Sequence, residues 1–145
     1  MILYLDSSAL VKRYVVEAGS KEVNRWISDA YPVVSGLLAR AEVAAAICRA
    51  TRLGWIGEEE GLRALKLFRA EWETIGRLPV HEATVRRADE LACRHNLRGY
   101  DAIHLACALL CQDGLGLPLT LATYDRQLWQ AGTEEGLALR PESLE

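Results

Sequence analysis

Short apolar runs that stop abruptly at polar residues constrain the fold of this chain more than any other feature. Ile2 to Leu5 ends at Asp6, and Leu119 to Thr123 is followed closely by Asp125. Runs of this length are typical of strands buried inside a sheet. Three further segments are interpreted as brief strands: 32–34, 75–80 and 137–140.

Longer segments with helical periodicity separate these runs. The segment after Asp101 carries no formal charge until Asp113, and a helix that is apolar on nearly every side is a central one. The alternation of short strands with longer helices predicts an α/β domain layered around a mostly parallel sheet. The expected helices span residues 9–17, 20–30, 35–54 with Ser35 as the cap, 57–73, 81–96, 101–111 and 126–132.

The length and charge of the chain limit its organisation and its partners. With 145 residues and no linker-like or low-complexity tract, residues 1–145 are expected to form a single domain. The net charge of −3 argues against a broad basic face for nucleic acid, so any such contact must be local. No apolar run approaches the length that spans a membrane.

The cysteines and the first residues of the chain suggest a cytoplasmic protein. The N-terminal residues lack a basic region and a cleavage site, so we expect no secretory signal and no disulfides. The cysteines contain no CxxC pair, and we expect reduced, buried thiols rather than a zinc site. They are Cys48, Cys93, Cys107 and Cys111.

Four acidic residues stand where chemistry is expected in such a fold. Asp6 and Asp125 follow two strands, and ligands of open α/β sheets bind at the carboxyl ends of strands. Glu42 interrupts a helix that is poor in charge, and Asp101 opens the most apolar helix of the chain. Buried carboxylates are rare unless they are paired or bind a metal.

A divalent cation would relieve the repulsion between four converging carboxylates. Ligation by oxygen alone suits Mg²⁺ or Mn²⁺ better than zinc, and such sites hydrolyse phosphodiester bonds without a nucleophilic side chain. Each acid also has a simpler interpretation. Asp6, Asp101 and Asp125 could cap helices, and Glu42 could pair with Arg40, Arg49 or a more distant base.

The order and spacing of four motifs resemble the PIN-domain nucleases, and in particular the VapC-type toxins of toxin–antitoxin pairs. The motifs are Leu3-Tyr4-Leu5-Asp6-Ser7-Ser8-Ala9-Leu10-Val11-Lys12, Arg40-Ala41-Glu42-Val43, Tyr100-Asp101-Ala102-Ile103-His104-Leu105-Ala106 and Leu121-Ala122-Thr123-Tyr124-Asp125-Arg126-Gln127-Leu128. Each motif alone is weak, but the ordered set covers essentially the whole chain.

The resemblance implies a three-layer α/β/α sandwich with a mostly parallel sheet. It also implies an endoribonuclease that hydrolyses RNA phosphodiester bonds and depends on Mg²⁺ or Mn²⁺. It implies that Asp6, Glu42, Asp101 and Asp125 form the catalytic metal pocket, supported by Ser8 and Thr123. It further implies a small VapB-like antitoxin as partner and a homodimer. It does not identify the RNA target or the number of metal ions.

Positive charge near the acids would be needed to hold RNA. Arg13 and Arg40 are candidates for phosphate contacts, while solvated helix surface is the simpler interpretation of each. His104 follows Asp101 by one turn and is interpreted as a core histidine with a satisfied hydrogen bond rather than a substrate contact. Among the tryptophans, Trp26 and Trp72 are expected to pack and Trp55 to be exposed at an interface.

Two other function classes remain open at this stage. The negative net charge fits a catalytically silent interaction module with the same fold. A single-stranded DNA nuclease also fits, since metal-assisted hydrolysis does not by itself distinguish RNA from DNA. Metal binding separates the first class from an enzyme, and parallel digestion of RNA and DNA separates the second from a ribonuclease.

Overall fold

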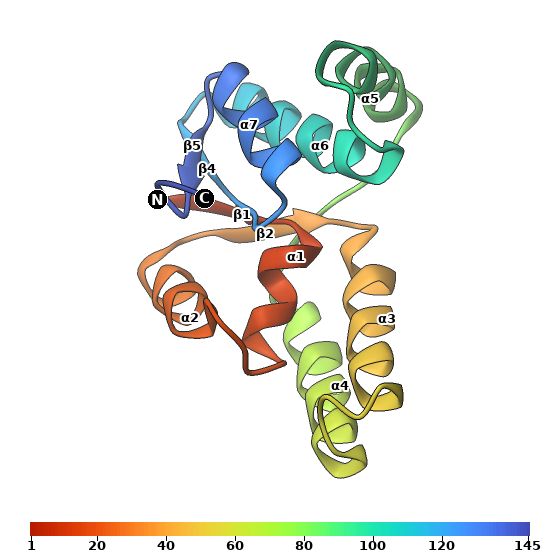
Figure 1. Ribbon diagram of the computed structural model, residues 1–145. Helices are drawn as coiled ribbons and strands as arrows, with labels where there is room; N and C mark the ends of the chain where they lie inside the picture. Colours follow the sequence, from red (N-terminus) through yellow and green to blue (C-terminus); the bar gives the residue numbers. More distant parts are fainter.

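The computed structural model describes residues 1–145, and one fully parallel sheet lies at its centre (Figure 1). The order of the strands in the sheet is β3-β2-β1-β4-β5. The five predicted strands are all present, β1 with the bounds expected and the others with ends that differ by at most two residues. They are β1 (Ile2–Leu5), β2 (Val33–Gly36), β3 (Gly76–Leu78), β4 (Leu119–Ala122) and β5 (Ala138–Arg140).

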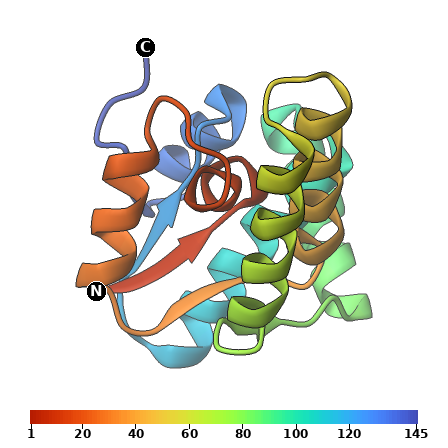
Figure 2. The same ribbon diagram turned by 90° about the horizontal axis from the view of Figure 1, so that it is seen from below.

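Helices cover both faces of the sheet, so the predicted α/β/α sandwich is confirmed (Figure 1). One face carries α1 (Ser7–Leu10) with the 3-10 turn η1 (Val11–Arg13), α2 (Ser20–Asp29), α3 (Ala39–Arg52) and α4 (Glu58–Trp72). The other carries α5 (Glu82–His95), α6 (Gly99–Leu115) and α7 (Arg126–Glu134). Figure 2 shows the first layer in front of the sheet, with α1 nearly end-on between α2 and the α3–α4 hairpin.

The central strand β1 divides the core into two halves. Its side chains alternate between the two faces of the sheet. Leu3 and Leu5 belong to a buried cluster of 15 residues under α1–α4, while Ile2 and Tyr4 belong to a cluster of 18 residues under α5–α7. The continuous apolar run at the start of the chain therefore reflects burial on both sides.

Two predicted helices have different bounds. Ser35 does not cap a helix: it lies in β2, fully buried, and its hydroxyl donates a hydrogen bond of 2.6 Å to the carbonyl of Leu5. Pairing of β2 with β3 extends the strand to Gly36, and α3 begins only at Ala39. The expected helix over 9–17 ends at Arg13 because the following residues turn toward α2, where the Ser20 hydroxyl accepts from the Glu17 amide.

The cysteine prediction is only partly right. All four cysteines are free, and Cys107 is buried. Cys48 and Cys93 are exposed on the outer surfaces of α3 and α5, so the expectation that they are buried is wrong, and Cys111 is partly exposed. Amphipathic helices leave one side to solvent, and these two thiols fall on that side. None of the helices combines the length and the apolar character needed to cross a bilayer.

The topology places a crevice beside the end of β1. From β1 the chain moves to β2 and β3 on one side, and it later returns to β4 and β5 on the other side. The carboxyl ends of β1 and β4 therefore lie next to each other where the direction of winding reverses. Ligands of open α/β sheets bind at such switch points.

Candidate active site

A cavity of about 290 Å³ lies at this switch point, and all four predicted acids line it. Asp6 directly follows β1, and Asp125 follows β4 after two intervening residues. Glu42 reaches the cavity from the first turn of α3, and Asp101 from the first turn of α6. The convergence expected from the sequence is thus present in the fold, with the four side chains contributed by four separate segments.

Asp6 is the most deeply buried of these acids. It is 2 % exposed, and it caps α1 by accepting a hydrogen bond of 3.0 Å from the Ala9 amide. Burial raises the pKa of its carboxyl, and this effect outweighs the opposing influence of the His104 charge and of the Thr123 and Ser8 hydroxyls. The carboxylate is therefore held in a place where its negative charge is costly without a positive partner.

Ser8 and Thr123 hold Asp6 from two sides and join the ends of β1 and β4. The Ser8 hydroxyl lies 2.7 Å from Oδ1 of Asp6, and the Thr123 hydroxyl lies 2.6 Å from Oδ2. The same hydroxyls accept from backbone amides, that of Tyr124 for Ser8 and that of Asp125 for Thr123. Both residues predicted to support the pocket therefore contact one of its acids, Asp6.

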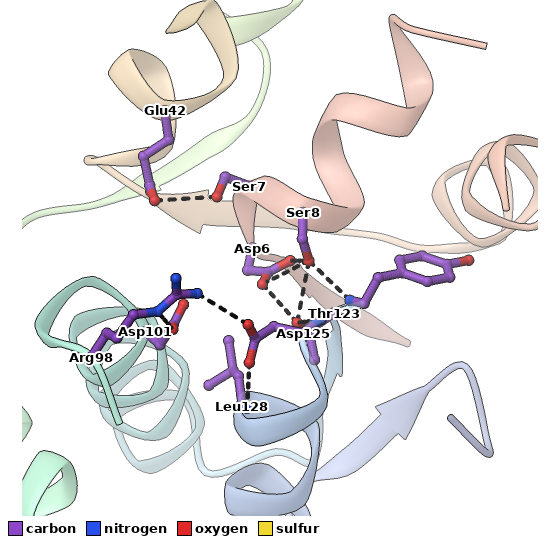
Figure 3. A network of polar contacts seen from close by, with 10 residues as sticks. Asp6, Ser7, Ser8, Glu42, Arg98, Asp101, Thr123, Asp125 and Leu128 are labelled. Carbon is purple, nitrogen blue, oxygen red and sulfur yellow. Dashed lines mark hydrogen bonds and ion pairs between the residues drawn. The ribbon is translucent and has the colours of Figure 1, made fainter. Parts of the chain in front are cut away.

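Asp101 and Asp125 share one arginine (Figure 3). Nε of Arg98 lies 3.2 Å from Oδ2 of Asp101, and Nη2 of Arg98 lies 3.2 Å from Oδ2 of Asp125. Burial and the nearby charge of Asp125 raise the pKa of Asp101 despite the arginine. Asp125 also caps α7 by accepting a hydrogen bond from the Leu128 amide.

Glu42 is held by a buried histidine and a serine. Nε2 of His104 lies 2.6 Å from Oε1 of Glu42, and the Ser7 hydroxyl donates to Oε2 at 3.2 Å. Burial alone would raise the pKa of Glu42, but the hydrogen bond and charge of His104 lower it on balance. The pKa of His104 is raised, because the Glu42 hydrogen bond and the Asp6 charge outweigh its burial. The pair is thereby favoured in its charged form.

Comparison with known proteins identifies the family to which this fold and acid pattern belong. A family model described as PIN domain matches residues 3–132, a range that includes all four acids. The chain belongs to the PIN-domain family. The relatives of this PIN domain include "Ribonuclease VapC49" of Mycobacterium tuberculosis, which is 31% identical over 144 residues, covering 99% of this chain and 98% of that protein. "Ribonuclease VapC3" of Pyrobaculum aerophilum is 33% identical over 130 residues, with 88% and 92% covered.

Solved structures agree on the fold of this PIN domain. A toxin–antitoxin complex from Klebsiella pneumoniae contains a chain with a TM-score of 0.70 and 16% identity, covering 99% of both chains. VapC20 of Mycobacterium tuberculosis, titled a Sarcin-Ricin loop cleaving toxin, has a TM-score of 0.66 and 15% identity, also with 99% of both chains covered. At these identities the likeness supports the fold and not a shared target.

The simpler interpretations of the acids hold only in part. Asp6 and Asp125 do cap helices, and they line the cavity at the same time. Asp101 is not a cap, since Arg98 occupies the N-cap position of α6. Glu42 pairs with a more distant base, as one of its simpler interpretations allows: the partner is His104 and not Arg40 or Arg49. Helix capping therefore does not account for the set of four.

Neither of the two arginines predicted to bind substrate lines the cavity. Arg13 faces α4, where its guanidinium makes a two-pronged contact with Glu71 at 2.9 and 2.6 Å and a further contact with Asn24. This correction follows from the short 3-10 turn, which directs Arg13 across the helical layer. Arg40 is half-buried in the first turn of α3 and forms no ion pair, but it does not line the cavity either.

Sequence reasoning missed the contacts that three residues make with the acids of the site. His104 is a core residue as expected, but its hydrogen bond goes to an acid of the cavity. Ser7 and Arg98 also contact the acids, and neither was assigned such a contact. The Asp-Ser-Ser sequence after the first strand is the one signal for the role of Ser7. At the start of a helix two adjacent hydroxyls point in different directions, so Ser7 and Ser8 can contact different acids.

The donor set of the cavity fits a hard divalent cation, although no three His, Cys, Asp or Glu side chains form a ready-made metal centre. The donors that face the cavity are carboxylate and hydroxyl oxygens, which suit Mg²⁺ or Mn²⁺. Asp101 and Asp125 lie close enough for the charge of one to raise the pKa of the other. Their shared positive charge is supplied by Arg98, whose side chain is 74% exposed.

Proposed function

We propose that this PIN domain is a metal-dependent endoribonuclease that acts as the toxin of a type II toxin–antitoxin pair. The observation that carries the proposal is the convergence of Asp6, Glu42, Asp101 and Asp125 on one cavity at the switch point of the sheet. Relatives that are named ribonucleases and cover nearly the whole chain support RNA as the substrate. Asp6, Asp101, Glu42 and Asp125 would hold Mg²⁺ or Mn²⁺.

A bound divalent ion in such a site polarises the phosphate, lowers the pKa of the attacking water and stabilises the leaving oxygen. The residues of the chain prepare this environment. Ser8 and Thr123 fix both oxygens of Asp6, and His104 and Ser7 fix both oxygens of Glu42. Because its pKa is lowered, Glu42 stays ionised near neutral pH and is available as a ligand or as an acceptor for a water proton.

Cleavage of RNA by the purified protein tests the proposal. Total RNA is incubated with the protein in Mg²⁺ or in EDTA, and the Asp6→Asn and Asp101→Asn variants are assayed in parallel. Asp89→Asn is the matched control, since Asp89 lies on the exposed surface of α5 away from the cavity. We expect cleavage by the wild type and by Asp89→Asn only in Mg²⁺, and none by the two site variants.

Two outcomes of the same assay would support the other function classes. Absence of cleavage, together with absence of Mg²⁺ and Mn²⁺ binding in a calorimetric titration, would favour a silent interaction module. Equal or faster digestion of single-stranded DNA in a parallel reaction would favour a DNA nuclease. Sequencing of the RNA ends produced after brief expression would then identify the target.

We further propose a small antitoxin as the partner of this protein. The support is indirect: several proteins of the same fold were solved as toxin–antitoxin complexes, among them those from Klebsiella pneumoniae and Haemophilus influenzae. A mainly apolar groove of about 350 Å³, which includes Leu10, Ile27 and Val33, offers a place for a partner segment. Co-purification with the product of a short neighbouring gene tests this partner.

A homodimer is also proposed. Trp55 is 69% exposed in the turn after α3, and Leu53 beside it is half-exposed, so this turn presents apolar surface to a second copy. Light scattering coupled to size-exclusion chromatography would report a dimer mass for the wild type and a monomer mass for Trp55→Ala.

The predicted cytoplasmic location of the protein stays a prediction.

A further inference from the structure

We propose that Arg98 competes with the metal ion for the carboxylates of Asp101 and Asp125. In the metal-free protein its guanidinium lies between these two acids, and a bound metal ion displaces it. The inference rests on the proposed function. It adds a role for Arg98, which is not one of the acids and does not come at the end of a strand. It is motivated by one geometric relationship: a single guanidinium contacts one oxygen of each of two acids that line the cavity, each at 3.2 Å.

The contacts of Arg98 make it easy to displace. Its side chain forms hydrogen bonds with these two carboxylates and with no other group of the protein, and it is 74% exposed. Exposed ion pairs of this kind are weak, because water screens them and the long side chain loses freedom when it is held. A divalent cation concentrates more charge in a smaller volume and can replace the guanidinium at both carboxylates.

The other two acids do not take part in this competition. The Asp6 oxygens accept from hydroxyls and a backbone amide, and Glu42 accepts from His104 and Ser7. These donors are fixed in the core or in the first turn of α1, so they need not leave when a cation arrives. The competition for positive charge is thereby confined to the Asp101–Asp125 side of the cavity. Figure 3 shows Arg98 on that side, in contact with both carboxylates.

The displaced guanidinium remains at the edge of the cavity. Arg98 is anchored through its backbone at the N-cap position of α6, three residues before Asp101, and it lines the cavity together with Tyr100, which is 67% exposed. Once the cation neutralises the two carboxylates, the anion left for Arg98 to bind there is a phosphate of the RNA. The same side chain then weakens metal binding in the free protein and strengthens RNA binding in the loaded one.

A titration with Mn²⁺ tests the first half of the proposal. Calorimetry or the electron paramagnetic resonance signal of free Mn²⁺ gives the dissociation constant for the wild type, Arg98→Ala and Arg126→Ala. Arg126 is the matched control, because it is an exposed arginine next to Asp125 that forms no ion pair. We expect Arg98→Ala to bind Mn²⁺ roughly three- to tenfold more tightly than the wild type, the range expected for loss of one or two exposed ion pairs. Arg126→Ala should stay within about twofold, since exposed charges are screened by salt.

The second half is tested by RNA binding in a background that cleaves slowly. Fluorescence anisotropy of a labelled single-stranded RNA compares Glu42→Gln with Glu42→Gln/Arg98→Ala, at a Mn²⁺ concentration that saturates both variants in the same calorimetric titration. We expect the arginine-free protein to bind RNA roughly three- to tenfold more weakly, the loss expected for one charge-assisted phosphate contact. The proposal thus predicts that loss of Arg98 strengthens Mn²⁺ binding and weakens RNA binding.

The outcomes separate this inference from the proposed function. If wild-type protein binds no Mn²⁺, both fall. If wild-type protein binds Mn²⁺ and Arg98→Ala binds it equally or more weakly, the proposed function stands and the competitor role of Arg98 is overturned. An equal tightening in Arg126→Ala would reduce the effect to net charge and overturn it too, as would RNA binding that is unchanged by loss of Arg98.

Discussion

The Nε2 atom of His104 lies 2.6 Å from Oε1 of Glu42, which joins the core helix α6 to the edge of the candidate active site. On the other side of the ring, Nδ1 lies 2.7 Å from the hydroxyl of Tyr4 in the central strand. His104 is 1% exposed, so the surrounding core holds the imidazole in this orientation. The orientation of Glu42 is therefore set from inside the core, as is common for residues that support a metal ligand.

Replacement of His104 tests this positioning role. His104→Ala should weaken Mn²⁺ binding and RNA cleavage by roughly 10- to 100-fold, because Glu42 loses the donor that orients it. His104→Gln should recover part of both, since its amide nitrogen can reach the same carboxylate oxygen. The dissociation constant for Mn²⁺ and the cleavage rate are measured on variants whose circular dichroism spectra match that of the wild type. Wild-type Mn²⁺ affinity in a folded His104→Ala protein would contradict the role.

Thr123→Val should destabilise the protein because it removes the 2.6 Å hydrogen bond from the threonine hydroxyl to Oδ2 of Asp6. The two side chains have nearly the same shape, so the loss is that of two hydrogen bonds: the one to the buried carboxylate and the one that the Asp125 amide donates to the same hydroxyl. Together they should cost about 3 kcal/mol in the free energy of unfolding at pH 7. Urea denaturation measures it. Thr133→Val, on the exposed part of α7, is the control and should change stability by less than about 0.5 kcal/mol. Equal effects of the two substitutions would refute this account of Asp6.

Asp6→Asn should separate stability from activity. Asparagine is as good a helix cap as aspartate, and it removes a carboxylate whose pKa is raised by burial. In EDTA we expect the variant to be at least as stable as the wild type, with a gain of about 1 kcal/mol near neutral pH, because function often costs stability at such sites. Its RNA cleavage should be lost. Thermal unfolding monitored by circular dichroism provides the measurement, and a clearly lowered melting temperature would count against the raised pKa.

The sign of the effect can be checked with pH. A carboxyl whose pKa is higher in the folded than in the unfolded protein gains stability as pH falls through the folded pKa. Asp6→Asn lacks this proton-binding step. The stability advantage of the variant should therefore be largest near neutral pH and should shrink as the pH is lowered toward 4, the ordinary range of an aspartate pKa. An advantage that is constant over this range would exclude Asp6 as its source.

The Arg13–Glu71 pair gives a pH dependence of the opposite sign. The hydrogen bonds from Arg13 hold the pKa of Glu71 below its usual value. Such a group contributes stability above its unfolded pKa, and the contribution is lost as pH falls through the lower folded pKa. Glu71→Gln should cost about 1 kcal/mol at pH 7, and the cost should fall progressively as the pH is lowered below about 4. Glu73→Gln, which removes a more exposed ion pair with Arg77, should have little effect at any pH in this range. Chemical denaturation over this range of pH measures both variants.

Local properties of the sequence determined the order of strands and helices and the position of each acid within them. Apolar runs and helical periodicity depend on neighbouring residues, so Ile2–Leu5 was predicted as a buried strand and residues 57–73 as an amphipathic helix. The ends of the strands and the place of Ser35 were harder to predict from the sequence, because the end of β2 is decided by its pairing with β3. A serine that caps a helix and a serine inside a strand look alike until that pairing is known.

Contacts between distant residues were decided only by the tertiary structure. His104 meets Glu42 across 62 positions of the chain, and Arg13 meets Glu71 across 58. Which side chains meet depends on the rotation of each helix about its axis and on the side of the sheet to which each crossover returns. Neither quantity is written in a short segment of sequence, because both result from packing the whole core at once. The sequence therefore determined which acids the protein has at its strand ends and helix starts, and the packing decided which bases face them.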